Sequence, residues 1–420
     1  MKIPRSKGAK DWPPEEMAVF RFMERIFREQ CRQWGYHEVR TPTIESLHLF
    51  TSAGTLTPSM LNRVYSFLDW DGWSGERVVL RPDGTIPIAR FYIDRMSDRK
   101  LAKLYYITNI FIFEETGREN RERWQCGTEL IGTDSPLADT ELIALVLKVL
   151  QELGIEDVTL RLSHAGLIKS LLTGLGLSTE EQTAVFDRIL DGDVATLAEL
   201  KLKRPGLEDA LPALLNLKGQ GTGFLNNLKA VTDVAESRPH LDNFLTIVNY
   251  LESLEQEYQI DIASGAGFEY YTGIVFQFFQ GDQKVGGGGR YDSLIPAMGG
   301  KATPACGFAL YLERLLPLIK SEKAEPPFPE KIRVTVNPGE NVPLKEILAT
   351  IDALHQAGYA AEPEITAQRL PEVRWLLEMR ESKPLFLLND LGRGNKFEAR
   401  DFTGVLKLLE AEDAHQNRPA

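Results

Sequence analysis

Apolar residues recur every three or four positions between residues 15 and 34, which is the spacing of one face of an α-helix. Pro13 and Pro14 open this segment, and Gly35 closes it. Because proline suits the first turn of a helix and glycine the position just after its end, the pattern predicts one amphipathic helix. Its apolar positions are Met17, Phe20, Met23, Phe27, Cys31 and Trp34.

Strand patterns dominate the next stretch of the chain. Residues 36–42 alternate between apolar and polar and run into a proline, which predicts a short strand. Residues 62–69 and 76–81 predict a hairpin, because Asp-Gly and Ser-Gly turn pairs separate them. The same reasoning predicts further strands at 104–113, 122–132 and 157–163, and a helix at 139–153.

Helical patterns then replace strand patterns from about residue 165 to 258, which predicts a helical insertion. Ser178 and Glu181 have the spacing of a capping box at a helix start. Strand patterns return at 260–263, 271–279 and 285–291. The segment 304–317 begins as a strand and ends as a helix.

A charged, proline-rich segment at 320–331 predicts a linker between domains. We therefore expect a core domain over residues 1–319 and a C-terminal domain over 332–420. Strand and helix patterns alternate in the C-terminal domain, which predicts a small α/β domain with a parallel sheet. Its predicted strands are 332–336, 359–361 and 385–388, and its predicted helices are 342–356 and 369–381.

Composition narrows the class of protein. The chain has 420 residues, 43% of them hydrophobic and 26% charged, which excludes wholesale disorder and a collagen-like chain. Three separated cysteines without a CxxC pair indicate a reducing cytoplasm, and the N-terminus does not read as a signal peptide. The histidines lack metal-ligand spacing, so no metal is expected. No cofactor is expected either. The net charge of −12 disfavours a protein that coats nucleic acid.

Several short motifs have both a chemical and a structural interpretation. Asp83 and Thr85 can hold a ligand ammonium group, or Asp83 can simply begin an Asp-Gly turn. Gln125 and Glu129 lie four apart on a predicted strand, so both side chains face the same side. The four glycines at 286–289 resemble a phosphate loop but lack its ending, and they also suit a crowded strand.

Taken in order, seven segments resemble the histidyl-tRNA synthetase family, a class II aminoacyl-tRNA synthetase fold. They read GAKDWPPEE, GYHEVRTPTIE, LRPDGT, a strand with Glu114 and a basic loop, GFEYYTGIVF, GGGGRYDSL and ACGFALYLERLL. The resemblance covers about residues 8–319 and implies an α+β fold, with an antiparallel sheet flanked by helices. It also implies a homodimer formed around Pro42, and a tail that resembles an anticodon-binding domain.

Three positions depart from the family on the side that binds ATP. Ile112 stands where the second motif has arginine, Ala266 stands where a second arginine is expected, and Tyr311 replaces a glycine. Arginine stabilises the charge that develops on the α-phosphate during amino-acid activation, and one such group is worth about 10²–10³ in rate. The resemblance therefore implies that activation has been lost and that the chain has no catalytic residue of its own.

The amino-acid side matches the family, with Asp83 in place of a glutamate. The resemblance implies that histidine is held by six residues: Asp83, Thr85, Gln125, Glu129, Tyr270 and Tyr271.

A kept histidine pocket beside a lost ATP site is similar to the regulatory subunits of ATP phosphoribosyltransferase. These synthetase paralogues pair with a short-form catalytic subunit in the first step of histidine biosynthesis. The resemblance implies a homodimer within a hetero-oligomer, with L-histidine as feedback effector. Two alternatives stay open: a working histidyl-tRNA synthetase, and another paralogue that binds tRNA or regulates a kinase. A tRNA partner is not expected, because residues 331–420 hold 12 Lys and Arg against 14 Asp and Glu.

Overall fold

The structure is a computed structural model of the full chain. It describes residues 3–53, 63–69, 75–113, 120–174, 176–178, 181–182, 217–231, 235–262, 271–320, 333–338, 341–365 and 374–416. The chain divides into two compact units, Met1–Ala324 and Glu325–Ala420. The division falls inside the segment 320–331 that the sequence marks as a linker.

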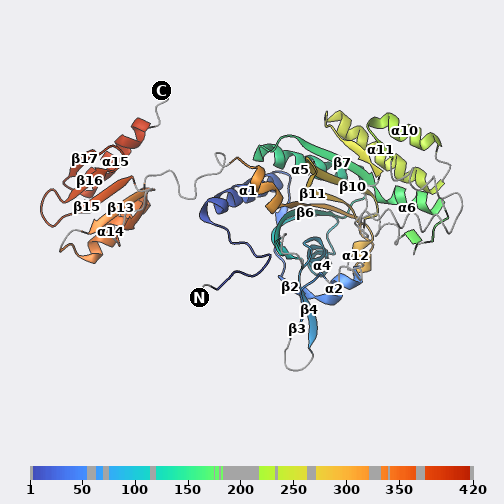
Figure 1. Ribbon diagram of the computed structural model, residues 1–420, viewed down its shortest axis with the longest axis horizontal. Helices are drawn as coiled ribbons and strands as arrows, with labels where there is room; N and C mark the ends of the chain where they lie inside the picture. Colours follow the sequence, from blue (N-terminus) through green and yellow to red (C-terminus); the bar gives the residue numbers. More distant parts are fainter. Residues whose placement is uncertain are drawn as a thin grey trace. The chain divides into compact units, whose positions relative to one another are not determined.

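A nine-stranded sheet forms the centre of the first unit (Figure 1). Neighbouring strands from β5 to β7 are all antiparallel, whereas β1 is parallel to β5 and β9 is parallel to β7. The predicted antiparallel sheet flanked by helices is therefore confirmed. In sheet order the strands are β1 (His37–Glu38), β5 (Ala102–Phe111), β6 (Glu122–Ile131), β12 (Ala305–Tyr311), β11 (Gln283–Arg290), β10 (Ile274–Gln280), β7 (Val158–His164), β9 (Gln259–Asp261) and β8 (Lys218–Gly219).

One face of this sheet carries the larger hydrophobic core, which packs against α1 (Pro14–Gln33), α5 (Pro136–Leu153) and α11 (Arg238–Ser253). The predicted helices at 15–34 and 139–153 are thus confirmed. Local signals set the limits of α5: the Ser135 hydroxyl accepts from the backbone of its first turn, Pro136 stands at its start, and Gly154 ends it at φ 72°.

The opposite face packs against α4 (Thr85–Arg95), α2 (Leu47–Ser52) and the short α12 (Leu294–Ala297) in a second core. A small three-stranded sheet joins β2 (Ile44–Ser46), β4 (Glu76–Leu80) and β3 (Ser66–Asp69). β3 and β4 are antiparallel, with Ser66 opposite Val79, so the predicted hairpin is confirmed. The strand predicted at 36–42 is shorter than expected, since only His37–Glu38 pairs with β5.

The described part of the predicted insertion is mainly helical. It holds α6 (Ala165–Gly174), α10 (Gly221–Val231), α11, a 3₁₀ turn at Ala235–Ser237 and the two-residue strand β8. The predicted capping box is present: the Glu181 carboxylate accepts from the Ser178 backbone at 2.8 Å, and the Ser178 hydroxyl accepts from the Glu181 backbone at 3.2 Å. A final helical segment, α13 (Leu312–Leu315) and the 3₁₀ turn Leu316–Leu318, follows β12 as predicted.

In its described residues, the second unit is a five-stranded sheet with two helices, α14 (Leu344–Gln356) and α15 (Phe402–Gln416). The predicted helix at 369–381 is wrong, because residues 375–379 form β15. The predicted parallel sheet is only partly right: β14, β13 and β15 are parallel, but β16 and β17 are antiparallel to their neighbours. The sheet order is β14 (Ala360–Pro363), β13 (Arg333–Pro338), β15 (Trp375–Met379), β16 (Phe386–Asp390) and β17 (Lys396–Ala399).

Candidate functional site

Gln125 and Glu129 lie on β6 at the middle of the large sheet, and both point to the face that α4 covers. In the register with β12, Gln125 pairs with Tyr311 and Glu129 pairs with Gly307. A Cβ atom at residue 307 would lie 1.8 Å from Glu129 Oε2, so only glycine leaves room for this carboxyl group. The two predicted site residues therefore share a face, as their spacing indicated.

Glu129 is fully buried, and the hydroxyl of Tyr291 donates a hydrogen bond to its Oε2. Burial raises the pKa of Glu129 to about 8, and the nearby charge of Asp83 adds to the shift. Its other oxygen, Oε1, has no hydrogen-bond partner among the residues that the structure describes. A buried acceptor without a partner is costly, which makes Oε1 a candidate contact for a ligand N–H.

Asp83 and Thr85 lie where β4 leads into α4. Asp83 Oδ1 accepts from the backbone N–H of Ile86 at 2.9 Å, so this carboxylate caps the start of the helix. The surrounding protein desolvates Asp83 and raises its pKa, while hydrogen bonds from the backbone at residues 84–86 oppose the shift. Asp83 thus has a structural role as a helix cap rather than in an Asp-Gly turn, and the charge of the same carboxylate reaches Glu129.

Tyr271 is buried just before β10, on the same side of the sheet. A Cβ atom at residue 289 would lie 3.1 Å from its ring, and its carbonyl accepts from Lys169 Nζ at 3.1 Å. The structure therefore brings Asp83, Thr85, Gln125, Glu129 and Tyr271 to one face of the sheet. Two further predicted positions, Tyr270 and Ala266, lie outside the described residues.

The glycine run belongs to β11 and packs tightly between β10 and β12. A Cβ atom at residue 288 would lie 2.1 Å from the carbonyl oxygen of Gly307. The close approach of neighbouring backbones explains the glycines, so the interpretation as a crowded strand is correct.

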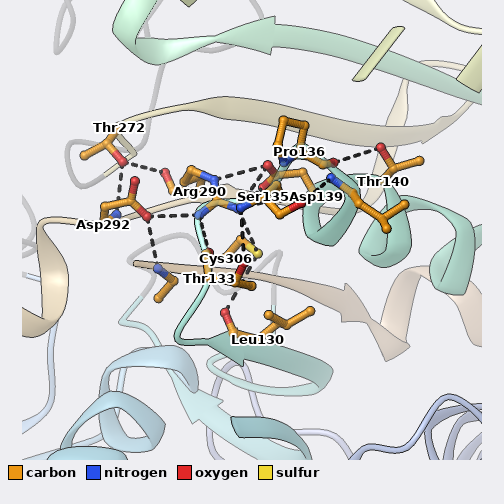
Figure 2. Close-up of polar contacts among 12 residues, drawn as sticks. Leu130, Thr133, Ser135, Pro136, Asp139, Thr140, Thr272, Arg290, Asp292 and Cys306 are labelled. Atoms are coloured by element: carbon orange, nitrogen blue, oxygen red, sulfur yellow. Dashed lines mark hydrogen bonds and ion pairs between the residues drawn. The ribbon is translucent and has the colours of Figure 1, made fainter. Parts of the chain in front are cut away.

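Arg290, which ends the glycine run, is the centre of a buried polar network (Figure 2). Its guanidinium donates to Asp139 Oδ2 at 3.0 and 3.1 Å, to the Thr133 carbonyl at 2.9 Å and to Asp292 Oδ1 at 3.1 Å. Its own carbonyl accepts from the Thr272 backbone at 2.8 Å. Burial raises the pKa of Asp139 to about 6, although Arg290 opposes the shift.

This network holds two segments that present side chains to the site. Tyr291 follows Arg290 directly and bonds Glu129, whereas Thr272 follows Tyr271. The Thr272 hydroxyl also accepts from the Asp292 backbone at 3.0 Å, which ties both segments together. The network therefore positions the site from behind the sheet.

Tyr311, at the end of β12, is one of the three positions where the sequence departs from the family pattern on the expected ATP side. The guanidinium of Arg314 lies 5.2 Å from the centre of its ring, and Arg314 Nη1 donates to the Lys284 carbonyl at 2.7 Å. Burial and the charge of Arg314 lower the pKa of Lys284 to about 7. Ile112 lies just beyond β5 and is half-buried. Its backbone N–H donates a hydrogen bond to the Arg121 carbonyl at 2.8 Å.

Two residues of the site were missed from the sequence: Tyr291 and Tyr106. Tyr291 stands next to the glycine run, and that proximity was the available signal. Tyr106 faces the site because it pairs with Gly127, which lies between Gln125 and Glu129. The sequence alone predicts neither the contact of Tyr291 with Glu129 nor the pairing of Tyr106 with Gly127, because both depend on how the strands align in the sheet.

Within the described part of the chain, no group of three or more His, Cys, Asp or Glu side chains is arranged to hold a metal ion. The helices described there also include none with the length and apolar character needed to cross a membrane.

Comparison with known proteins identifies relatives along nearly the whole chain. Residues 8–315 match the histidyl-tRNA synthetase family. The ATP phosphoribosyltransferase regulatory subunit of Dehalococcoides mccartyi is 48% identical over 413 residues, which cover 98% of this chain and 99% of that protein. The histidine–tRNA ligase of Methanocaldococcus jannaschii is 31% identical, over 97% and 98% of the two chains.

Solved structures share the fold at low sequence identity. The structure of an ATP phosphoribosyltransferase regulatory subunit/histidyl-tRNA synthetase from Bacillus halodurans aligns with a TM-score of 0.74 and 22% identity. That alignment covers 88% of this chain and 95% of the other. The histidyl-tRNA synthetase of Nostoc aligns with a TM-score of 0.73 and 19% identity, over 98% and 100% of the two chains.

Proposed function

The chain belongs to the histidyl-tRNA synthetase family and, within it, to the regulatory subunits of ATP phosphoribosyltransferase, and we propose that it binds histidine to regulate a catalytic partner. One observation carries the assignment: the 48% identity to a curated regulatory subunit extends over nearly the full length of both chains. The histidine–tRNA ligase compared above is more distant, at 31%. The chain therefore has a regulatory role in the first step of histidine biosynthesis.

The effector in this proposal is L-histidine, held by Asp83, Thr85, Gln125, Glu129, Tyr270 and Tyr271. Two acidic side chains on the site face suit its ammonium group and its imidazole N–H. The buried Oε1 atoms of Gln125 and Glu129, both without a partner in the described part of the chain, support a ligand that donates hydrogen bonds.

The chain in this proposal makes no histidyl-adenylate. Ile112 and Tyr311 support it, because an apolar side chain and a phenol ring stand where the family has an arginine and a glycine. The loss at Ala266 remains a prediction from the sequence. Histidine-dependent exchange of pyrophosphate into ATP, measured on the purified chain, tests this directly. Exchange at the rate of a synthetase would contradict it.

The partner is the short-form catalytic subunit of ATP phosphoribosyltransferase, which a regulatory subunit must contact to act. We further propose a homodimer formed around Pro42 as the unit of a larger hetero-oligomer, without tRNA. A cytoplasmic location belongs to the same proposal, since Cys31, Cys126 and Cys306 are buried free thiols that suit a reducing compartment.

Reconstitution tests the function as a whole. The chain is mixed with a short-form transferase, and phosphoribosyl transfer to ATP is followed with and without L-histidine. We expect the chain to form a complex with the transferase, raise its activity and make that activity sensitive to histidine. If no complex forms and activity does not change, the regulatory assignment is wrong.

A further inference from the structure

Tyr106 occupies a special place in the register of the large sheet. On β5 it pairs with Gly127 of β6, whereas the β5 residues two positions away, Thr108 and Leu104, pair with Gln125 and Glu129. Paired residues of antiparallel strands point to the same face. The Tyr106 side chain therefore extends over the site face, between the two polar side chains of β6.

Two glycines make room for the Tyr106 ring. A Cβ atom at residue 127 would lie 2.3 Å from Cζ of Tyr106 and 2.4 Å from its hydroxyl oxygen. A Cβ atom at residue 84 would lie 2.4 Å from Cε2 and 2.8 Å from the same oxygen. The hydroxyl group is therefore held where the start of α4 meets β6.

The hydroxyl of Tyr106 is buried close to the side chains of Thr85 and Glu129, but no hydrogen bond of good geometry satisfies it among the described residues. The charges of Glu129 and Asp83 reach it and, together with burial as the main cause, raise its pKa well above the usual value. Its surroundings include Thr85 and Tyr271 as well. Four described residues of the proposed histidine site, Asp83, Thr85, Glu129 and Tyr271, therefore influence the Tyr106 hydroxyl. The fifth, Gln125, lies on β6 two positions from Gly127, the residue that pairs with Tyr106.

We propose that the Tyr106 hydroxyl is a direct ligand contact of this candidate site and accepts a hydrogen bond from the ammonium group of the bound amino acid. This inference rests on the proposed histidine site and adds a residue to it. An ammonium group has three N–H donors and no acceptor, so it needs several acceptors around it. The hydroxyl oxygen of Tyr106, the Oε1 atom of Gln125 and the Asp83 carboxylate supply such a set.

The polarity of the site explains why a cation suits this position. The unsatisfied oxygens of Gln125, Glu129 and Tyr106 can each accept a hydrogen bond, and a cation bound beside the phenol would favour the ionised forms of Glu129 and Asp83. A phenol can donate its proton to one carboxylate while its oxygen accepts from the ligand. A ligand carboxylate at the same place would meet repulsion from both acids.

The test compares Tyr106→Phe with the wild-type chain in calorimetric titration of L-histidine. Phenylalanine keeps the ring that fits against Gly84 and Gly127 and removes only the hydroxyl group. A hydrogen bond to a charged group contributes about 1.5–3 kcal/mol, so the dissociation constant should rise roughly 10- to 150-fold. Histamine, which keeps the ammonium group, should lose affinity by a similar factor. Imidazolepropionate, which lacks that group, should lose much less.

Tyr105→Phe is the matched control. Tyr105 is the adjacent residue on β5, but its ring lies in the core on the opposite face, and its hydroxyl donates to Glu38 at 3.1 Å. This variant should keep the wild-type affinity for histidine. The ammonium contact is wrong if Tyr106→Phe binds histidine like the wild type, or if imidazolepropionate loses as much affinity as histidine. A wild-type chain that does not bind histidine at all would instead contradict the proposed function.

Discussion

Replacing Glu129 by glutamine should remove a large pH dependence from the stability of the chain. Glu129 is fully buried, and its pKa in the folded state is about 8. In an unfolded chain a glutamate titrates near 4.3. Between these two values the folded state binds a proton that the unfolded state has released, so this group's contribution to the free energy of unfolding falls as pH rises.

The size of the effect follows from the shift in pKa. Each pH unit within this window changes the free energy of unfolding by about 1.4 kcal/mol through this one group. Between pH 5 and pH 7 the loss amounts to roughly 2–3 kcal/mol. Glutamine has nearly the shape of glutamic acid and cannot ionise, so Glu129→Gln should become progressively more stable than the wild type as pH rises.

The measurement is urea unfolding of the full chain without ligand at pH 5, 6, 7 and 8.5, with the difference between variant and wild type taken at each pH. Other buried groups, such as Asp139, also titrate, and the difference cancels their contribution. Glu122→Gln is the control, because it makes the same change on the same strand at an exposed position. A difference for Glu129→Gln that stays constant from pH 5 to pH 8.5 would refute the account of this carboxyl group.

Two further variants test the framework of the site. Arg290→Met should lower the free energy of unfolding by about 3–5 kcal/mol, because it leaves Asp139 buried without its cation. In the same urea experiment, the double variant Arg290→Met with Asp139→Leu should recover most of that loss. Gly127→Ala should cost about 1–3 kcal/mol of stability and weaken histidine binding at least tenfold in calorimetry, because the added Cβ displaces the Tyr106 ring; unchanged affinity would contradict the assigned packing.

Local patterns predicted those elements that bury one face. The first helix, the hairpin and the capping box each follow from contacts within a few residues, so periodicity and turn residues were enough. Gln125 and Glu129 were expected on one face for the same reason. The helix predicted at 369–381 failed because β15 lies between two strands and is largely buried on both faces, so Trp375, Leu376 and Leu377 show no alternation.

The missing parts of the candidate site depend on contacts between distant segments. Tyr291 bonds Glu129 across 162 positions of the chain. Tyr106 is close in sequence to β6, but its role depends on the register that places it opposite Gly127. Asp83 shows a related limit, since a turn and a ligand contact were weighed as alternatives although one carboxylate can both cap a helix and contact a ligand.

Histidine inhibition of the reconstituted complex tests the central claim most directly. The double variant Asp83→Asn with Glu129→Gln removes both ionisable carboxyl groups, while asparagine keeps the helix cap and glutamine keeps the side-chain volume. We expect the complex to assemble and the histidine concentration for half-inhibition to rise tenfold or more, since a coupling of about 1–3 kcal/mol corresponds to roughly 5- to 150-fold. An assembled complex with unchanged inhibition would show that histidine does not regulate the enzyme through this pocket.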